Sequence, residues 1–215
     1  MKAYRWIALS LLMQAGVASA ATVTVTVVDS KGEKVDNAVV TVTDPASPSA
    51  GKVNDGTVTQ IDKEFVPFVI AVEQGAKVSF PNKDSTRHHV YSFSDAKQFE
   101  IPLYSGTPGE PVAFDKPGVV ALGCNIHDWM SSYIYVSPTP YFGVTDQRGV
   151  ATINQVPAGE FQVEVWHPEL KGDVASTRQN LGVGEDGSSA LTIEISKKRL
   201  WKSWRSPTAN GGGYR

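Results

Sequence analysis

The sequence predicts an all-β protein, and three observations support that class. Residues 22–28 (TVTVTVV) alternate polar and apolar side chains, the period of a half-buried strand. Clusters of Gly, Pro, Asn and Asp separate further short apolar segments at the spacing typical of β-sandwiches and barrels. No segment of useful length has a helical period. With 41% hydrophobic and 20% charged residues, the chain has the composition of a folded domain.

The first twenty residues have the pattern of a secretory signal peptide. Lys2 and Arg5 supply its positive end, residues 7–13 its short apolar core, and residues 18–20 (ASA) its cleavage site. We therefore expect residues 1–20 to be removed near Ala20, and the mature protein to be periplasmic or secreted. The apolar core is too short for a transmembrane anchor.

The remaining chain carries an uneven charge. Loss of Lys2 and Arg5 changes the formal net charge from −2 to −4. Residues 197–215 carry +6 without an acid and lack periodicity, so we expect a basic flexible tail. The body before the tail therefore carries −10. Such a charge excludes nucleic acid as the expected partner, because its binding requires neutralisation of phosphates.

Strand candidates follow one another along the mature chain. After residues 22–28 and a turn-rich stretch, residues 39–43 (VVTVT) repeat the alternation. Further candidates are residues 68–72, 76–80, 89–93, 119–122, 132–136, 161–166 and 190–195. Two loop-rich joints, residues 45–55 and 137–140, enclose a block that carries the cysteine, three of the four histidines and one methionine.

The single cysteine points to a metal site. Cys124 cannot form an internal disulfide, although an exported protein would allow one. His127 and Met130 follow it at a spacing of C-x2-H-x2-M, directly after the apolar segment GVVALG. Copper that alternates between Cu(I) and Cu(II) favours one thiolate, two imidazoles and a weak axial thioether. One loop can present three of these donors, so the fourth must come from elsewhere in the chain.

A histidine pair is the candidate for the fourth donor. A strand ends at Phe80, and His88 and His89 open the next one after a loop. Adjacent residues of a strand face opposite sides, so only one of the two can be a ligand in regular geometry. Strand alternation alone leaves the choice between them open.

The same residues also have simpler interpretations. Cys124 could be a buried core thiol, and Met130 could serve packing only. A zinc site would be expected to have more thiolate or carboxylate and no thioether. Asp128 is expected to face solvent or brace the loop, and Trp129 to pack beside it. Residues 166–168 (WHP) are expected to form a surface turn, with a metal or sugar contact as the alternative.

Over roughly residues 60–136, the sequence resembles the cupredoxins, the blue-copper electron carriers. The spacing of Cys124, His127 and Met130 resembles that of amicyanin, and Asn82 lies six residues before His88, as in plastocyanin-type proteins. This resemblance implies one type-1 copper bound by these three residues and His88, with Asn82 behind the ligands. His89 stands where the family usually has Asn, so it either braces the site or is itself the ligand.

A closer resemblance concerns three stretches, FPNKD…HHVYSF, FDKPGVV and LGCNIHDWM. Together they look like the exported cupredoxin-like proteins known as methylamine-utilisation proteins. The resemblance implies that residues 55–138 form a cupredoxin Greek-key β-sandwich.

The flanking segments resemble a different family. VTVVDSKGEKVDNAVVTV is similar to the opening of carboxypeptidase-regulatory-like domains, and its expected continuation appears only after the block, at residues 144–149 and 156–163. We therefore expect residues 21–48 plus 141–196 to form a second, transthyretin/Ig-like β-sandwich. The cupredoxin would be inserted into it or joined to it, because the ends of surface loops lie close together. One larger contiguous β-fold is the alternative.

The resemblance implies a periplasmic electron-transfer protein rather than an enzyme. Its partner would be a redox protein such as a c-type cytochrome or a periplasmic dehydrogenase. The first alternative is a periplasmic protein for copper binding, storage or delivery without redox cycling. A second alternative is an adhesion or carbohydrate-binding module whose copper site has decayed.

Overall fold

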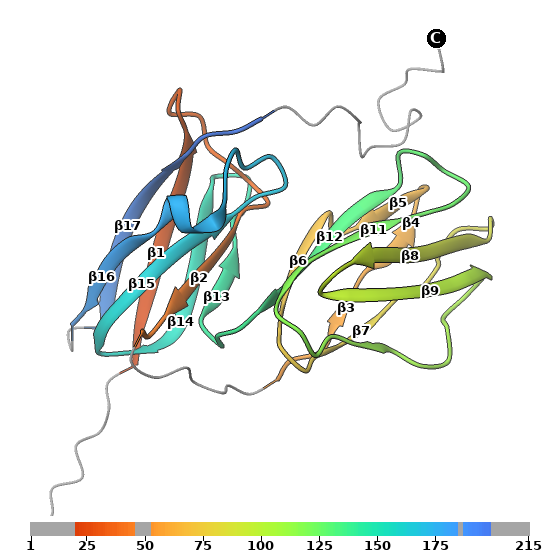
Figure 1. Ribbon diagram of the computed structural model, residues 1–215, viewed down its shortest axis with the longest axis horizontal. Coiled ribbons are helices and arrows are strands. Elements are labelled where there is room, and N and C mark those ends of the chain that lie inside the picture. Colours follow the sequence, from red (N-terminus) through yellow and green to blue (C-terminus); the bar gives the residue numbers. More distant parts are fainter. Residues whose placement is uncertain (1–19, 46–52, 185–186, 199–215) are drawn as a thin grey trace, which may run out of the picture.

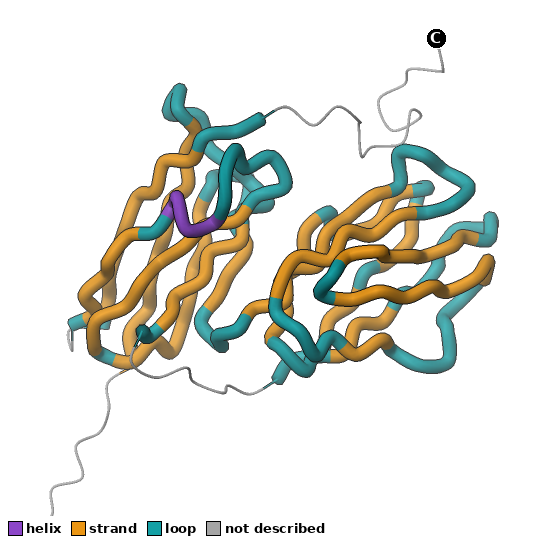
Figure 2. Tube along the Cα trace, viewed as in Figure 1, coloured by secondary structure: helices purple, strands orange, loops and turns teal. Residues whose placement is uncertain are grey.

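The computed structural model describes residues 20–45, 53–184 and 187–198, and these residues confirm the all-β class. They form seventeen strands and one short 3-10 helix, η1 (Val174–Thr177), so that strands dominate the trace in Figure 2. Within the described ranges, no helix is long and apolar enough to cross a membrane. The expected signal peptide, apart from Ala20, and most of the expected basic tail lie outside the described residues.

Strands from both ends of the chain form one group, which we call the terminal sandwich (Figure 1). In its first sheet, β1 (Ala20–Asp29) lies between β14 (Val150–Pro157), to which it is antiparallel, and β17 (Ser188–Ile195), to which it is parallel. Its second sheet has the order β13 (Phe142–Val144), β2 (Val39–Thr43), β15 (Gly159–Trp166) and β16 (Gln179–Val183).

Alternation along β1 explains how this sandwich closes. Val23, Val25 and Val27 are fully buried, while the threonines between them are half-buried. The three valines join residues of the second sheet, such as Val40 and Val163, in one apolar core. Burial of apolar surface between the two sheets thus stabilises the pairing of segments far apart in the sequence.

The strands between these segments form a second group, the central sandwich. Its larger sheet has the order β6 (Val69–Glu73), β12 (Ser131–Ser137), β11 (Gly118–Gly123), β8 (His88–Ser94) and β9 (Lys97–Tyr104). Facing it are the sheet β10 (Val112–Ala113), β7 (Lys77–Ser79) and β3 (Gly56–Thr57), and the hairpin of β4 (Thr59–Ile61) and β5 (Glu64–Val66). Among the described residues, β3 to β12 pair only with one another.

An aromatic cluster connects the two sandwiches. Val39 of the terminal sandwich packs with Phe68 and Val69 of the central one. The Tyr133 ring makes edge contacts with the rings of Phe68 and Trp166, at centroid distances of 5.6 Å in both cases. The central sandwich is therefore fixed against the terminal one by direct packing as well as by the chain.

His167 follows β15 and begins a turn, as expected for residues 166–168, in which the Leu170 amide donates to the His167 carbonyl at 2.9 Å. The His167 side chain is buried, however, and does not lie at the surface. Its Nδ1 accepts a hydrogen bond from the Glu169 amide at 3.0 Å. Burial, followed by the nearby Lys197 charge, lowers the pKa of His167 from 6.5 to about 4. The imidazole therefore stays neutral in the folded protein at a pH where it is protonated in the unfolded chain.

This burial predicts a loss of stability in mild acid. The stabilising contribution is fully present above pH 6.5 and is lost as the pH falls toward 4. Between pH 7 and 4.5 we expect a loss of about 2 kcal/mol from this group. Urea unfolding at both pH values should show a smaller pH effect for His167→Gln than for the unchanged protein. Equal pH effects in the two proteins would contradict the prediction.

Candidate metal centre

Three potential metal donors meet at one end of the central sandwich. His88 opens β8, Cys124 directly follows β11, and His127 lies in the loop that leads to β12. One donor atom from each residue lies within 4.8 Å of the others. The Cys124 Sγ and His127 Nδ1 atoms are 4.0 Å apart, and the rings of His88 and His127 have centroids 5.0 Å apart.

The donors are held in an environment that suits a metal ion. His88 is fully buried, and its Nδ1 has no hydrogen-bond partner among the residues that the structure describes. Cys124 is also buried, while His127 is partly exposed. A buried polar atom without a partner costs about 1–3 kcal/mol, unless a bound group satisfies it. The free nitrogen beside a thiolate and a second imidazole therefore fits a soft or borderline metal such as copper.

The loop between β11 and β12 is short and closed by its own backbone. The Met130 amide donates to the His127 carbonyl at 3.0 Å, and the Cys124 amide donates to the Met130 carbonyl at 3.3 Å. These bonds keep the three residues together, as the C-x2-H-x2-M spacing predicts. The Met130 side chain is buried and lines the same cavity as Cys124.

The two adjacent histidines have different surroundings. His88 belongs to the donor group, and its Nε2 lies 2.7 Å from Asp84 Oδ2. The His89 Nε2 lies 2.8 Å from Glu100 Oε1 on β9, and its ring packs on Tyr91. The two rings thus have different partners, at a point where the pairing of β8 with β9 is irregular. Like His88, His89 has a buried Nδ1 without a hydrogen-bond partner.

Asn82 braces the loop before His88. Its side-chain amide donates to the carbonyls of Thr86 and Tyr104, at 2.9 Å and 3.0 Å, and its Oδ1 accepts from the Asp84 amide at 2.9 Å. The asparagine therefore fixes the backbone on both sides of the loop that leads to His88.

Several ionisable groups near the donors have shifted pKa values. Burial would raise the pKa of Asp84, but amide hydrogen bonds from Lys63 and Asp62, together with the bond to His88, lower it overall. Burial, followed by the charges of His88 and Lys63, lowers the pKa of His127. Burial raises the pKa of Tyr104 to about 12. The site thus favours a carboxylate at Asp84, a neutral His127 and a neutral phenol.

The sequence did not reveal all the residues that support the donors. Asp84, Gln60 and Tyr104 were not candidates, yet Asp84 contacts His88, and the Gln60 amide donates to the Tyr104 hydroxyl. The acid four residues before His88 was the only signal available for Asp84. Trp129 packs beside His127 as expected, and its Nε1 also donates to the Lys63 carbonyl at 2.9 Å.

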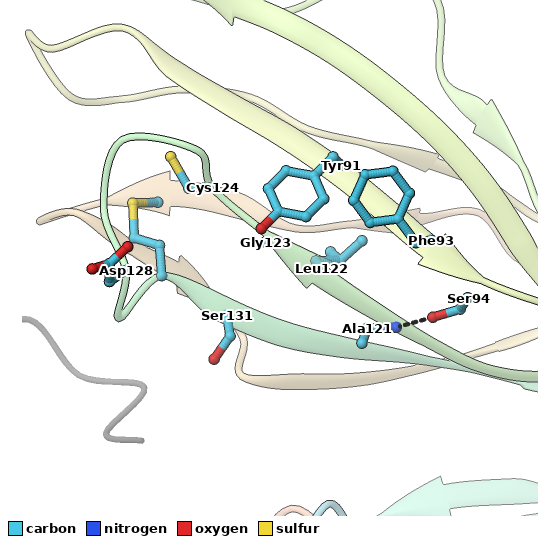
Figure 3. Close-up of a pocket in the computed structure, with 10 residues that line it drawn as sticks. Tyr91, Phe93, Ser94, Ala121, Leu122, Gly123, Cys124, Asp128 and Ser131 are labelled. Carbon is cyan, nitrogen blue, oxygen red and sulfur yellow. Dashed lines mark hydrogen bonds between the residues drawn. The ribbon is translucent and has the colours of Figure 1, made fainter. Parts of the chain in front are cut away.

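A cavity of about 370 Å³ lies beside two of the sulfur atoms. Its walls include Tyr91, Phe93, Cys124 and Met130. Figure 3 shows the Tyr91 ring next to Gly123, immediately before Cys124 in the chain. A Cβ atom at Gly123 would lie 2.6 Å from Tyr91 Cζ, so only glycine allows the ring to cover this strand so closely.

Comparison with known proteins finds copper proteins among the solved structures that resemble part of this chain. No protein-family model and no curated protein matches the chain. The structural neighbours are cupredoxins. The copper-containing nitrite reductase of Thermus scotoductus SA-01 is 26% identical over 44% of this chain and 27% of its own, with a TM-score of 0.37.

Two further solved structures are small copper proteins. The purple cupredoxin of Nitrosopumilus maritimus is 21% identical over 39% of this chain and all of its own, with a TM-score of 0.35. A reduced Cu(I) form of amicyanin is 17% identical over 47% of this chain and all of its own, with a TM-score of 0.36. A likeness at these TM-scores assigns no function to this chain.

Proposed function

We propose that this chain is a type-1 copper protein that carries electrons and catalyses no reaction of its own. One observation carries the proposal: donor atoms of His88, Cys124 and His127 lie within 4.8 Å of one another around a buried, unpartnered imidazole nitrogen. One thiolate and two imidazoles, with the Met130 thioether beside them, suit both oxidation states of copper. A structural zinc site would normally contain more thiolates.

The roles of the residues follow from their positions. Cys124, His88 and His127 would hold the metal, and Met130 would add a weak thioether donor. Bound copper would supply a one-electron couple. The burial of His88, Cys124 and Met130 keeps water away from these donors, and the closed loop limits their movement between oxidation states.

Electrons would leave through the exposed side of His127. Ile126 beside it is 45% exposed, although it is a large apolar residue. Leu103, at 44% exposure, is a second exposed apolar residue at the end of β9, next to the Tyr104 that pairs with His88. Apolar residues of this kind suit the small, weak interface of a transient redox complex. A c-type cytochrome or a periplasmic dehydrogenase is the partner we propose.

The proposal includes the organisation and location of the chain. We propose a discontinuous, carboxypeptidase-regulatory-like domain over residues 21–48 and 141–196, a cupredoxin domain over residues 55–138, and a basic tail over residues 197–215. The pairing of β1 with β14 and β17 supports this division. The signal-peptide pattern supports export to the periplasm, and the motifs support a protein of the methylamine-utilisation type.

Copper loading tests the proposed function. We expect the Cu(II) form of the mature chain to show strong visible absorption from thiolate-to-Cu(II) charge transfer and an EPR signal of type-1 copper. A small-molecule mediator should reduce and reoxidise the bound metal. Binding without this absorption, or copper that cannot be cycled, would contradict the carrier function and support copper storage or delivery.

The Met130 thioether predicts a change in reduction potential. Met130→Leu should leave copper bound but raise the potential, because loss of even a weak donor disfavours Cu(II). A rise on the order of 60 mV corresponds to about 1.4 kcal/mol for a one-electron couple. Protein-film voltammetry measures the shift, and Ile134→Leu, in the same core, is the control. An unchanged or lower potential in Met130→Leu would assign Met130 to packing alone.

A further inference from the structure

The turn between β4 and β5 consists of two residues. Asp62 and Lys63 both have positive φ values, 55° and 60°, a backbone conformation that suits a tight hairpin. The Asp62 amide donates to Asp84 Oδ1 at 2.8 Å, and the Lys63 amide donates to Asp84 Oδ2 at 2.9 Å. One turn therefore holds both carboxylate oxygens of Asp84.

Further backbone bonds attach β4 to the loop that contains Asp84. The Gln60 amide donates to the Pro81 carbonyl, and the Lys83 amide donates to the Gln60 carbonyl, both at 2.8 Å. Main-chain hydrogen bonds thus join β4, which leads into the turn, to the loop before His88.

Asp84 connects the turn to the first donor segment. Its Oδ2 lies 2.7 Å from His88 Nε2, and because an ionised carboxylate can only accept, the imidazole donates its Nε2 proton. A neutral imidazole with its proton on Nε2 has its lone pair on Nδ1. The Nδ1 atom is the buried nitrogen without a partner. Asp84 therefore selects the form of His88 that can bind a metal.

The same turn contacts the second donor segment. The Lys63 carbonyl accepts a hydrogen bond from Trp129 Nε1 at 2.9 Å. The Trp129 ring packs against the ring of His127, with centroids 5.1 Å apart. One residue, Lys63, thus contacts the His88 segment through its amide and the His127 segment through its carbonyl.

We propose that the Asp62–Lys63 turn is a clamp that fixes His88 and His127 relative to each other, with Asp84 and Trp129 as its positioning residues. The proposal rests on the metal site proposed above. According to this proposal, the β4–β5 turn holds the two histidines in position although it contains neither of them. Apart from the clamp, the two histidines lie on different elements, His88 at the start of β8 and His127 in the loop between β11 and β12.

Asp84→Asn tests the contact between the clamp and His88. The asparagine can present its NH₂ group to His88 Nε2, which favours the imidazole form with its proton on Nδ1. We expect ¹⁵N NMR of the metal-free protein to show this change of tautomer, and copper affinity to fall roughly 10- to 100-fold. Glu100→Gln, the same change beside His89, is the control and should leave His88 and copper affinity unchanged. An unchanged tautomer and affinity in Asp84→Asn would overturn the proposal.

Trp129→Phe tests whether the two contacts of the clamp, with the His88 segment and with the His127 segment, depend on each other. The substitution removes the indole donor but retains an aromatic ring beside His127. Each single variant should weaken copper binding. In the double variant, the fold-loss of copper affinity should be smaller than the product of the two single fold-losses. The reason is that loss of either contact already separates the His88 segment from the His127 segment. If the two single fold-losses of copper affinity simply multiply in the double variant, the proposed clamp is wrong. Failure of the proposed function is distinguishable, because the tautomer and affinity measurements require no charge-transfer absorption and no redox cycling.

Discussion

Cys124→Ser is expected to abolish the intense visible absorption of the copper-loaded protein. The absorption requires a covalent bond between copper and a thiolate, which a hydroxyl oxygen cannot supply. Cys124 is buried at the end of β11, and serine has nearly the same shape, so the surrounding core should remain packed. Absorption and EPR spectra of both proteins after identical copper loading measure the effect.

Two controls make the Cys124→Ser result specific. Met130→Leu should keep the strong absorption, which shows that a core substitution at the site does not remove it by itself. Urea unfolding of the metal-free variant should show a loss of no more than about 1–3 kcal/mol, the cost of a buried hydroxyl. Strong absorption that survives in Cys124→Ser would exclude Cys124 as the thiolate ligand.

His88→Ala is expected to remove the type-1 signature, whereas His89→Ala should only perturb it. His88 alone of the pair has a donor atom within 4.8 Å of those of Cys124 and His127. His89 is paired with Glu100 on the other side of the sheet, so its loss acts only through strand packing. Absorption and EPR spectra of both copper-loaded variants distinguish the two roles.

Exogenous imidazole provides the control for the histidine pair. His88→Ala leaves space beside the remaining donors, so added imidazole should restore part of the absorption in that variant. It should have no effect in His89→Ala. The reverse pattern, in which His89→Ala loses the signature and His88→Ala keeps it, would reassign the ligand to His89.

The sequence by itself determined the features that depend on near neighbours. Alternation in residues 22–28 predicted β1, because a strand with one buried face repeats every second residue. The spacing of Cys124, His127 and Met130 predicted that one short loop would carry all three, because they lie between the strand candidates at residues 119–122 and 132–136. The all-β class followed from many such local patterns.

Other strands were not predicted, for an identifiable physical reason. β9 and β16 were absent from the candidates, and the structure shows β9 to be at most half-buried along its whole length. A strand at the edge of a sheet needs no continuous apolar face, so its sequence shows a weaker alternation. β14 interrupts its alternation with two adjacent exposed residues, Asn154 and Gln155, and Gln155 has a positive φ of 62°.

Only the tertiary structure decided how the donor set is supported. Strand alternation required that His88 and His89 point apart, but the packing of β8 between β11 and β9 decided which of them faces Cys124. The contacts of Asp84 with the Asp62–Lys63 turn, and of Lys63 with Trp129, join residues distant in the chain through backbone amides and a carbonyl. Backbone groups are the same in every residue, so no sequence pattern marks which of them will meet a particular side chain.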